Sequence, residues 1–537
     1  MNVMLHLGLG SFHRAHQAVY LDALIRSGDA SWALAGGNIR PDMAETIAAL
    51  IQQDGAYTLE TISPAGEHRY QRIGSIRQVI AYQPDLAGLI AEGAKASTRI
   101  ISFTVTEAGY YLDAQNRLDL EAFADLRADL DAARAGRPGA TLYGALTAIL
   151  RARMASGAGA VTLLNCDNLR HNGERSRAGL LQFIGLIGDE ALLAWVEAHT
   201  TSPNAMVDRI TPRPTAAVRE RVKTATGVDD AAALMGESFI QWVIEDNFIA
   251  GRPAWEQVGV EMVQSVDAYE EAKIRLLNAT HSCIAWAGTL VGYQYIHEGT
   301  HDAQIRGMAY DYVTDDVIPV LDTPENPCPL DLPRYRDVVL DRFGNPAICD
   351  TNQRVAMDGF SKVPGFIAPT IRERLARGQS IDSVAMLPAL FLTYLQRWHL
   401  GQIPYTYQDQ AMQPEVAHAM CAAADPVAAF CADPTLWGEL AADTRLLDAV
   451  RRAHDRAGRG LVQCRARFHV RTGLHPGAEL PYEPLPDRHR DPERDAHLHD
   501  QVHAHVGADA RQPGVHERHE PGEAGEEVHA RRQHHVQ

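Results

Sequence analysis

The sequence has few cysteines, no long apolar run and fewer positive than negative charges. Its seven cysteines in 537 residues are odd in number and scattered, without a Cys-x-x-Cys pair, so neither a disulfide framework nor a thiolate zinc site is predicted. The N-terminus lacks the basic and apolar regions of a secretory signal, and no stretch of about 18 apolar residues follows. We therefore expect a protein of the reducing cytoplasm that is neither secreted nor membrane-spanning.

The charge balance excludes a further class of partner. Lys and Arg number 50 against 68 Asp and Glu, which gives a formal net charge of −18 and repels phosphate backbones, so nucleic acid is not an expected partner. A content of 46% hydrophobic and 22% charged residues is typical of a soluble globular protein, and the length suffices for two or more cores. The sequence shows no internal repeat.

The first recognisable motif is a short apolar strand at residues 3–8 that meets a glycine turn and then a helical pattern. Gly8 and Gly10 at this junction allow the backbone to approach a pyrophosphate at the start of a helix. His13 stands where a third glycine is usual, so the dinucleotide-binding fingerprint is partial. A tight turn without a ligand remains the alternative.

Further strands are predicted at residues 32–36, 57–62, 99–105 and 160–164, with helical stretches between them such as 143–154. This alternation predicts a mostly parallel sheet, and polar clusters follow two of the strands, at 106–111 and 165–173. Beyond about residue 240 the pattern is mainly helical, at 237–248, 269–293, 303–314 and 386–398. We expect an α/β domain over residues 1–240 and an α-helical domain over 241–457.

The acidic residue that would hold an adenosine ribose is expected just after the second strand, where the chain carries Arg40 and Asp42. Asp42 favours NAD through the ribose hydroxyls, whereas Arg40 suits the 2′-phosphate of NADP. Either side chain is equally compatible with a solvated loop or a helix cap. We therefore expect NAD to be preferred over NADP, on the basis of Asp42.

The most informative segment is residues 269–281, YEEAKIRLLNATH, a predicted helix. At about 100° per residue, Lys273, Asn278 and His281 lie within about 140° of one another. An ammonium, a carboxamide and an imidazole on one side can deprotonate an alcohol and stabilise its alkoxide without a metal, as hydride transfer requires. An ordinary amphipathic helix is the alternative.

Five motifs in order resemble those of the polyol-specific long-chain dehydrogenases, the mannitol dehydrogenase family: GLGSFHRAH at 8–16, TEAGY at 106–110, NCDN at 165–168 followed by HNG at 171–173, NAMVDRITP at 204–212, and KIRLLNATH at 273–281. The resemblance covers roughly residues 1–455. It implies a Rossmann-like N-terminal domain, a helical C-terminal domain, NAD as cofactor and a monomer. The implied reaction is oxidation of D-arabinitol to D-xylulose, with mannitol or a uronate as alternative substrates.

The resemblance also implies roles for individual residues. Lys273 is the expected general base, which requires a dry site because an exposed lysine titrates near 10.4. Asn168 and Asn278 are expected to donate to the developing alkoxide, and His281 to bind a substrate hydroxyl. Asp208, Arg354 and Glu270 are expected at the substrate, although salt bridges or helix capping would also explain them. The residues expected at the cofactor are Gly8, Gly10, Phe12, His13, Arg14, Asp42, Glu107 and Gly109.

Two other readings of the site remain open on sequence alone. Lys273 could form a Schiff base with a sugar carbonyl, as in an aldolase. A non-catalytic dinucleotide-binding sensor would explain the glycine turn, but not the coincidence of Lys273, Asn278 and His281.

Residues 458–537 differ from everything before them, since His and Arg crowd together and apolar periodicity disappears. We expect a disordered extension, and its composition resembles a gene translated out of frame. Histidine pairs such as 497 and 499 offer a metal-binding alternative.

Overall fold

The computed structural model describes residues 1–105, 107–113 and 116–471. Its principal sheet has six parallel strands in the order β5 (Ile76–Ile80), β2 (Trp32–Gly37), β1 (Asn2–Leu7), β6 (Thr98–Phe103), β7 (Val161–Asn165) and β8 (Thr200–Thr201). The order runs outward from β1 in both directions, so a crevice opens between the carboxyl ends of β1 and β6. The α/β prediction with a mostly parallel sheet is confirmed.

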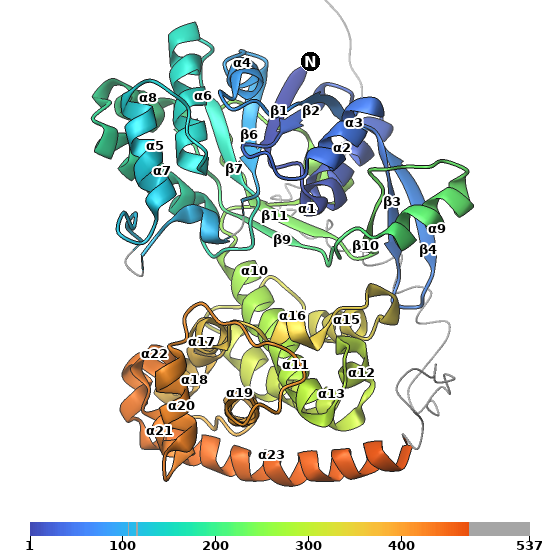
Figure 1. Ribbon diagram of the computed structural model, residues 1–537, viewed down its shortest axis with the longest axis vertical. Coiled ribbons are helices and arrows are strands. Elements are labelled where there is room, and N and C mark those ends of the chain that lie inside the picture. Colours follow the sequence, from blue (N-terminus) through green and yellow to red (C-terminus); the bar gives the residue numbers. More distant parts are fainter. Residues whose placement is uncertain (106, 114–115, 472–537) are drawn as a thin grey trace, which may run out of the picture. The chain divides into compact units, whose positions relative to one another are not determined.

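Helices cover both faces of this sheet, with α2 and α3 on one side and α4 to α8 on the other (Figure 1). Two separate hydrophobic cores result: Met4 of β1 belongs to one, and its neighbours Leu5 and Leu7 belong to the other. This division follows from the alternation of side chains along a strand. The helices are α1 (Ser11–Ala15), α2 (Gln17–Arg26), α3 (Ala44–Gln52), α4 (Ala87–Gly93), α5 (Ala124–Arg134), α6 (Leu142–Ser156), α7 (Asn172–Ile187), α8 (Glu190–His199) and α9 (Ala216–Thr226).

Two three-stranded sheets flank the principal one. One has the order β10 (Leu234–Glu237), β3 (Tyr57–Ile62), β4 (His68–Ile73), so the strand predicted at 57–62 exists but lies outside the principal sheet. The other has the order β12 (Glu261–Val263), β11 (Gln241–Glu245), β9 (Ala205–Asp208). The helix predicted at 237–248 is therefore wrong. Its buried apolar residues pair antiparallel with β9, and this tertiary pairing decides between helix and strand for a short apolar run.

From α10 to Arg471 the described chain is mainly helical. Its elements are α10 (Asp267–Ala272), η3 (Lys273–Asn278), α11 (Ala279–Val291), α12 (Ile296–His301), α13 (Ala303–Asp311), η4 (Tyr312–Val317), α14 (Ile318–Leu321), α15 (Leu332–Phe343), α16 (Asn352–Ala356), α17 (Gly359–Lys362), η6 (Val363–Ile367), α18 (Ala368–Ala376), α19 (Met386–His399), α20 (Pro414–Ala422), α21 (Pro426–Cys431), α22 (Pro434–Trp437) and α23 (Thr444–Arg471). Short 3₁₀ turns are η1 (Glu107–Tyr110), η2 (Trp255–Val258), η5 (Pro346–Ile348) and η7 (Gly438–Ala442).

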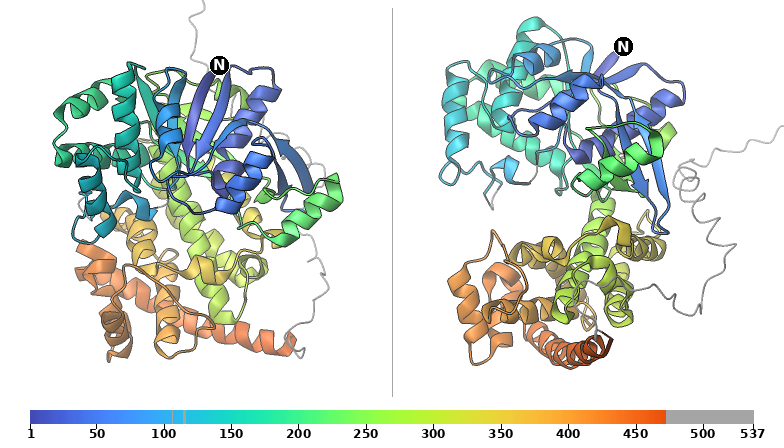
Figure 2. Two further views of the ribbon diagram at one scale, coloured as in Figure 1. Left: turned by 45° about the horizontal axis from the view of Figure 1, so that its top comes forward. Right: turned by 45° about the vertical axis from the view of Figure 1, so that its right-hand side comes forward.

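The core of the helical part is built around α11, which is buried at every position except His281, whose side chain is mostly buried. Helices α16, α19 and α23 pack against it, and α23 also runs along α19 (orange-red in Figure 2). The helix α23 extends past residue 457, where a different kind of segment was expected to begin, and residues 472–537 of that segment lie outside the described residues. Among the described residues, no helix is both long and apolar enough to cross a membrane.

Candidate active site

The helix that carries Lys273 is not a plain α-helix. Between α10 and α11 the segment η3, Lys273–Asn278, is a π-helix. Its hydrogen bonds join residues five apart, so Asn278, five residues after Lys273, turns to nearly the same side of the helix. The predicted common face of Lys273, Asn278 and His281 is thus narrower than a regular α-helix would make it. Nothing in the sequence indicated this π turn.

Lys273 lies in a dry environment although it carries an amine. Its side chain is buried, and Nζ donates hydrogen bonds to Asn168 Oδ1 at 2.6 Å and to the Val207 carbonyl oxygen at 2.5 Å. Burial lowers the pKa of Lys273 because desolvation penalises the ammonium, while the nearby Asp208 carboxylate opposes that shift. A lysine in this state can release its proton to solvent and take one from an alcohol.

Asn168 reaches Lys273 from the segment that follows β7. An ammonium has no lone pair, so the Asn168 atom that faces it must be the amide oxygen. The Asn168 amide nitrogen then points away from Lys273 and keeps its two donors for another ligand. Asn168, Glu270 and Lys273 line one small cleft, so that Asn168 and Lys273, 105 residues apart in sequence, lie in contact.

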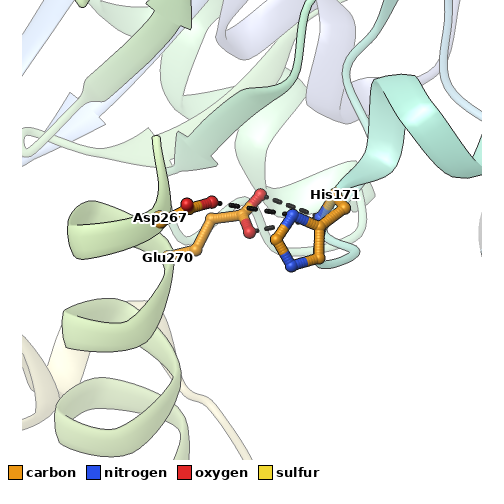
Figure 3. Close-up of side chains that lie close together, drawn as sticks. All are labelled: His171, Asp267 and Glu270. Carbon is orange, nitrogen blue, oxygen red and sulfur yellow. Dashed lines mark hydrogen bonds and ion pairs between the residues drawn. The ribbon is translucent and has the colours of Figure 1, made fainter. Parts of the chain in front are cut away.

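Glu270 lies one helical turn before Lys273 and lines the same cleft. Figure 3 shows its carboxylate next to His171 and Asp267. Burial raises the pKa of this carboxyl group to about 7, and the hydrogen bond from the His171 backbone N–H only partly offsets that. The His171 ring contacts Asp267, with Nδ1 3.6 Å from Oδ1. Glu270 therefore sits between the buried lysine and polar groups nearer the surface, and can carry a proton at neutral pH.

Asp208 is held in a buried ion pair. Both of its carboxylate oxygens accept hydrogen bonds from Arg342 of α15, at 2.7 and 3.0 Å. Burial alone would raise the pKa of Asp208, but Arg342 and Lys273 outweigh burial and hold it below its ordinary value. The structure therefore places Asp208 beside the lysine, with both oxygens already bound by a guanidinium.

His281 and Arg354 are joined by an aspartate that sequence reasoning missed. His281 Nε2 lies 3.2 Å from Asp350 Oδ2, and Arg354 Nε donates to Asp350 Oδ1 at 2.7 Å. The His281 ring also stacks on Phe343, with ring centroids 4.2 Å apart. Burial lowers the pKa of His281 and Asp350 opposes this. The only sequence signal for Asp350 was its i, i+4 spacing from Arg354.

The glycine turn after β1 closely approaches the next strand in the sheet. Gly8 has φ +110°, and a Cβ atom there would lie 2.6 Å from the Thr104 carbonyl oxygen. Gly10 begins α1 without a side-chain cap, which leaves the first N–H groups of that helix open to an anion. Asn38, which sequence reasoning missed, accepts the Leu9 N–H at 2.8 Å and fixes the turn against the end of β2.

Two of the side chains after this turn, His13 and Arg14, point inward. His13 is buried and stacks on His6 of β1, with ring centroids 3.5 Å apart. Arg14 is buried and donates from Nη1 to the Ala232 carbonyl oxygen at 2.5 Å. Phe12 is partly buried against His16. Of the residues expected at the cofactor, His13 and Arg14 are thus packed in the interior, whereas Phe12 stays partly exposed.

Asp42 is exposed in the loop after β2, where the acidic residue was expected. In the same loop, Arg40 Nη2 donates to the Tyr111 hydroxyl at 2.6 Å and lies 3.6 Å from Asp125. Gly109 lies in η1 at the end of β6, where a Cβ atom would come 2.9 Å from Val105 Cγ2. The Glu107 side chain lies outside the described residues.

The chain is similar to known dehydrogenases over most of its length. The chain matches the model of the mannitol dehydrogenase Rossmann domain over residues 2–257 and that of the mannitol dehydrogenase C-terminal domain over residues 265–457. It is 60% identical over 464 residues to a D-arabinitol 4-dehydrogenase of Ralstonia nicotianae, covering 86% of this chain and 96% of the relative. It is 54% identical over 447 residues to a D-arabinitol 4-dehydrogenase of Klebsiella pneumoniae, covering 83% and 96%.

Two solved dehydrogenase structures have the same fold as this chain. A Pseudomonas fluorescens mannitol 2-dehydrogenase in ternary complex with NAD and D-mannitol superimposes with a TM-score of 0.73 at 34% identity, over 87% of this chain and 94% of that one. A substrate-free D-sorbitol dehydrogenase gives a TM-score of 0.77 at 32% identity with the same coverage. The family predicted from the five motifs is confirmed: this chain belongs to the mannitol dehydrogenase family.

Proposed function

We propose that the protein oxidises D-arabinitol at C4 to D-xylulose, with NAD as the hydride acceptor. The observation that carries the chemistry is the buried Lys273 amine in contact with Asn168, where both line one cleft. The substrate is supported by the two D-arabinitol 4-dehydrogenases at 60% and 54% identity. Because these relatives are dehydrogenases, we favour hydride transfer over a Schiff base on Lys273 or a non-catalytic sensor.

The residues of the crevice fit a dinucleotide. The turn at Gly8 and Gly10 brings bare backbone to the edge of the sheet, and the uncapped start of α1 offers N–H donors to a pyrophosphate. Asp42 stands where it can accept from ribose hydroxyls, and it repels a 2′-phosphate, which supports NAD over NADP. When bound, the nicotinamide supplies the position that accepts the hydride.

Lys273 then acts as the general base. Its neutral amine removes the proton of the C4 hydroxyl, and the N–H donors of Asn168 and Asn278 stabilise the alkoxide as hydride leaves the carbon. Each preorganised donor is worth about 3 kcal/mol in such a site. Glu270, whose pKa burial raises to about 7, passes the lysine proton toward solvent through the surface near His171. His281 binds a neighbouring hydroxyl, with Asp350 fixing its ring.

The test compares NADH formation with D-arabinitol, D-mannitol, D-sorbitol and xylitol in the wild type, Lys273→Ala and Lys223→Ala. Lys223 is an exposed lysine on α9 and serves as the matched control. We expect preference for D-arabinitol with NAD, and a loss of about 10²- to 10⁴-fold in kcat in Lys273→Ala alone. Preference for D-mannitol would move the substrate assignment, and full activity of Lys273→Ala would overturn the proposed base.

Two attributes of the intact protein belong to the same proposal. We propose that it is a monomer in the cytoplasm. Its mass by light scattering during size-exclusion chromatography tests the first, since a dimer would elute with twice the mass of 58.9 kDa. Cell fractionation tests the second.

A further inference from the structure

Arg342 is a buried cation that binds two buried carboxylates. It lies on α15 and holds both oxygens of Asp208 at the end of β9. It also donates to both oxygens of Glu237 at the end of β10, at 3.0 and 2.7 Å. Phe239 covers it, with the guanidinium carbon 4.0 Å from the ring centroid. Because these groups are at most 5% exposed, water screens their charges little.

This network adjoins the lysine. Lys273 Nζ binds the carbonyl oxygen of Val207, the residue just before Asp208, and the Asp208 carboxylate acts electrostatically on the Lys273 ammonium. The Asp208 carboxylate is thus in direct contact with Arg342 and acts on Lys273 only electrostatically. Arg342 takes both Asp208 oxygens in a two-pronged contact, and a guanidinium keeps its proton where an amine can lose it.

We infer that Arg342 is a positioning residue for the reaction: by binding both oxygens of Asp208, it prevents that carboxylate from pairing with Lys273 and so leaves Lys273 free to lose its proton. This inference rests on the proposed role of Lys273 as base. Without Arg342, the Asp208 charge would have the Lys273 ammonium as its cationic neighbour in a dry interior, and would stabilise the protonated form.

Other charged groups also face Lys273 and must be considered. Glu270 on α10 favours the ammonium, and Arg342 itself disfavours it. His16, between α1 and α2, is buried and donates from Nε2 to the Gln241 carbonyl oxygen at 2.8 Å, and burial lowers its pKa so that the ring stays neutral. Of the carboxylates that stabilise the Lys273 ammonium, Asp208 is the one that Arg342 binds directly.

The experiment measures kcat/KM for D-arabinitol from about pH 6 to pH 10.5 in the wild type, Arg342→Met, Asp208→Asn and the double variant. We expect Arg342→Met to move the acid limb of the kcat/KM profile to higher pH, by about one pH unit or more. In the double variant the limb returns close to its wild-type position, because Arg342 acts through Asp208. Arg342→Lys, which keeps the charge without the two-pronged contact, gives a smaller upward shift.

The matched control is Arg374→Met. Arg374 forms a buried pair with Asp316 at 3.0 Å among the helices, so its loss should reduce stability and leave the pH profile unchanged. An unshifted limb in folded Arg342→Met, or a shift that persists in the double variant, overturns the inference.

If Arg342→Met does not fold, Arg342→Lys decides, because it keeps the buried charge and loses the two-pronged contact with Asp208. Its acid limb must move to higher pH, and an unchanged limb overturns the inference. A wrong assignment of Lys273 as the base would give a different result. In that case Lys273→Ala would keep its activity and its acid limb would stay at the wild-type pH.

Discussion

Replacing Asn168 by aspartate is the most discriminating single change at this site. The two side chains have the same shape, but the variant loses the amide donors and places a carboxylate against the lysine amine, which lies 2.6 Å from Asn168 Oδ1. Two losses follow. The alkoxide loses a donor worth about 10²- to 10³-fold in kcat. The new charge raises the pKa of Lys273 by about one to three units, which protonates the base at neutral pH.

The combined effect at pH 7.5 is a fall in kcat of about 10⁴-fold, which recovers about tenfold per unit as the pH rises. Asn168→Ala removes the donor without adding charge. It should lose about 10²- to 10³-fold in kcat with no upward shift of the acid limb.

The assay is NADH absorbance under saturating D-arabinitol and NAD over about pH 6 to 10.5, with folding checked by circular dichroism. Two results would refute the reasoning: an aspartate variant within about threefold of the wild type, or the same pH profile for the aspartate and alanine variants. Either would mean that Asn168 does not face the reacting oxygen and that its contact with Lys273 is structural.

Three further predictions concern other parts of the site. Burial raises the pKa of Glu270 from about 4.5 to about 7, so the stability that its protonated form contributes is present at low pH and is lost as the pH rises through 7. The Tm of Glu270→Gln minus the Tm of the wild type should therefore grow between about pH 4.5 and pH 7. A Tm difference that stays constant over this range would contradict the prediction. Asp42→Ala should raise kcat/KM with NADP relative to NAD by about tenfold, measured side by side with Asp54→Ala as an exposed control, and an unchanged ratio would exclude Asp42 from the ribose site. Gly8→Ala places a Cβ atom 2.6 Å from a carbonyl oxygen at φ +110°, so NADH binding measured by fluorescence titration should weaken by at least about tenfold, whereas equal affinity would show that the turn does not bind the cofactor.

Local patterns sufficed for much of this protein. The apolar strand at 3–8, its glycines and the following helix are signalled within a dozen residues, because a turn with positive φ and a helix start each have a short signature. The alternation of strands and helices predicted the parallel sheet, whose strand ends then indicated where polar clusters should lie. Lys273 and His281 could be assigned to one helix face because helical periodicity is local.

Only tertiary structure decided the rest. Within the run at 237–248, Gln241–Glu245 forms the strand β11 because β9 was available to pair with it. The π turn at Lys273–Asn278, the inward orientation of His13 and Arg14, and the capture of Asp208 by Arg342 all depend on packing. Arg342 and Asp208 are 134 residues apart, and Lys273 of the helical part finds its hydrogen-bond acceptors, Asn168 and Val207, in the α/β part. A sequence pattern names the groups, but the distances and the dielectric that set their chemistry exist only once the chain has folded.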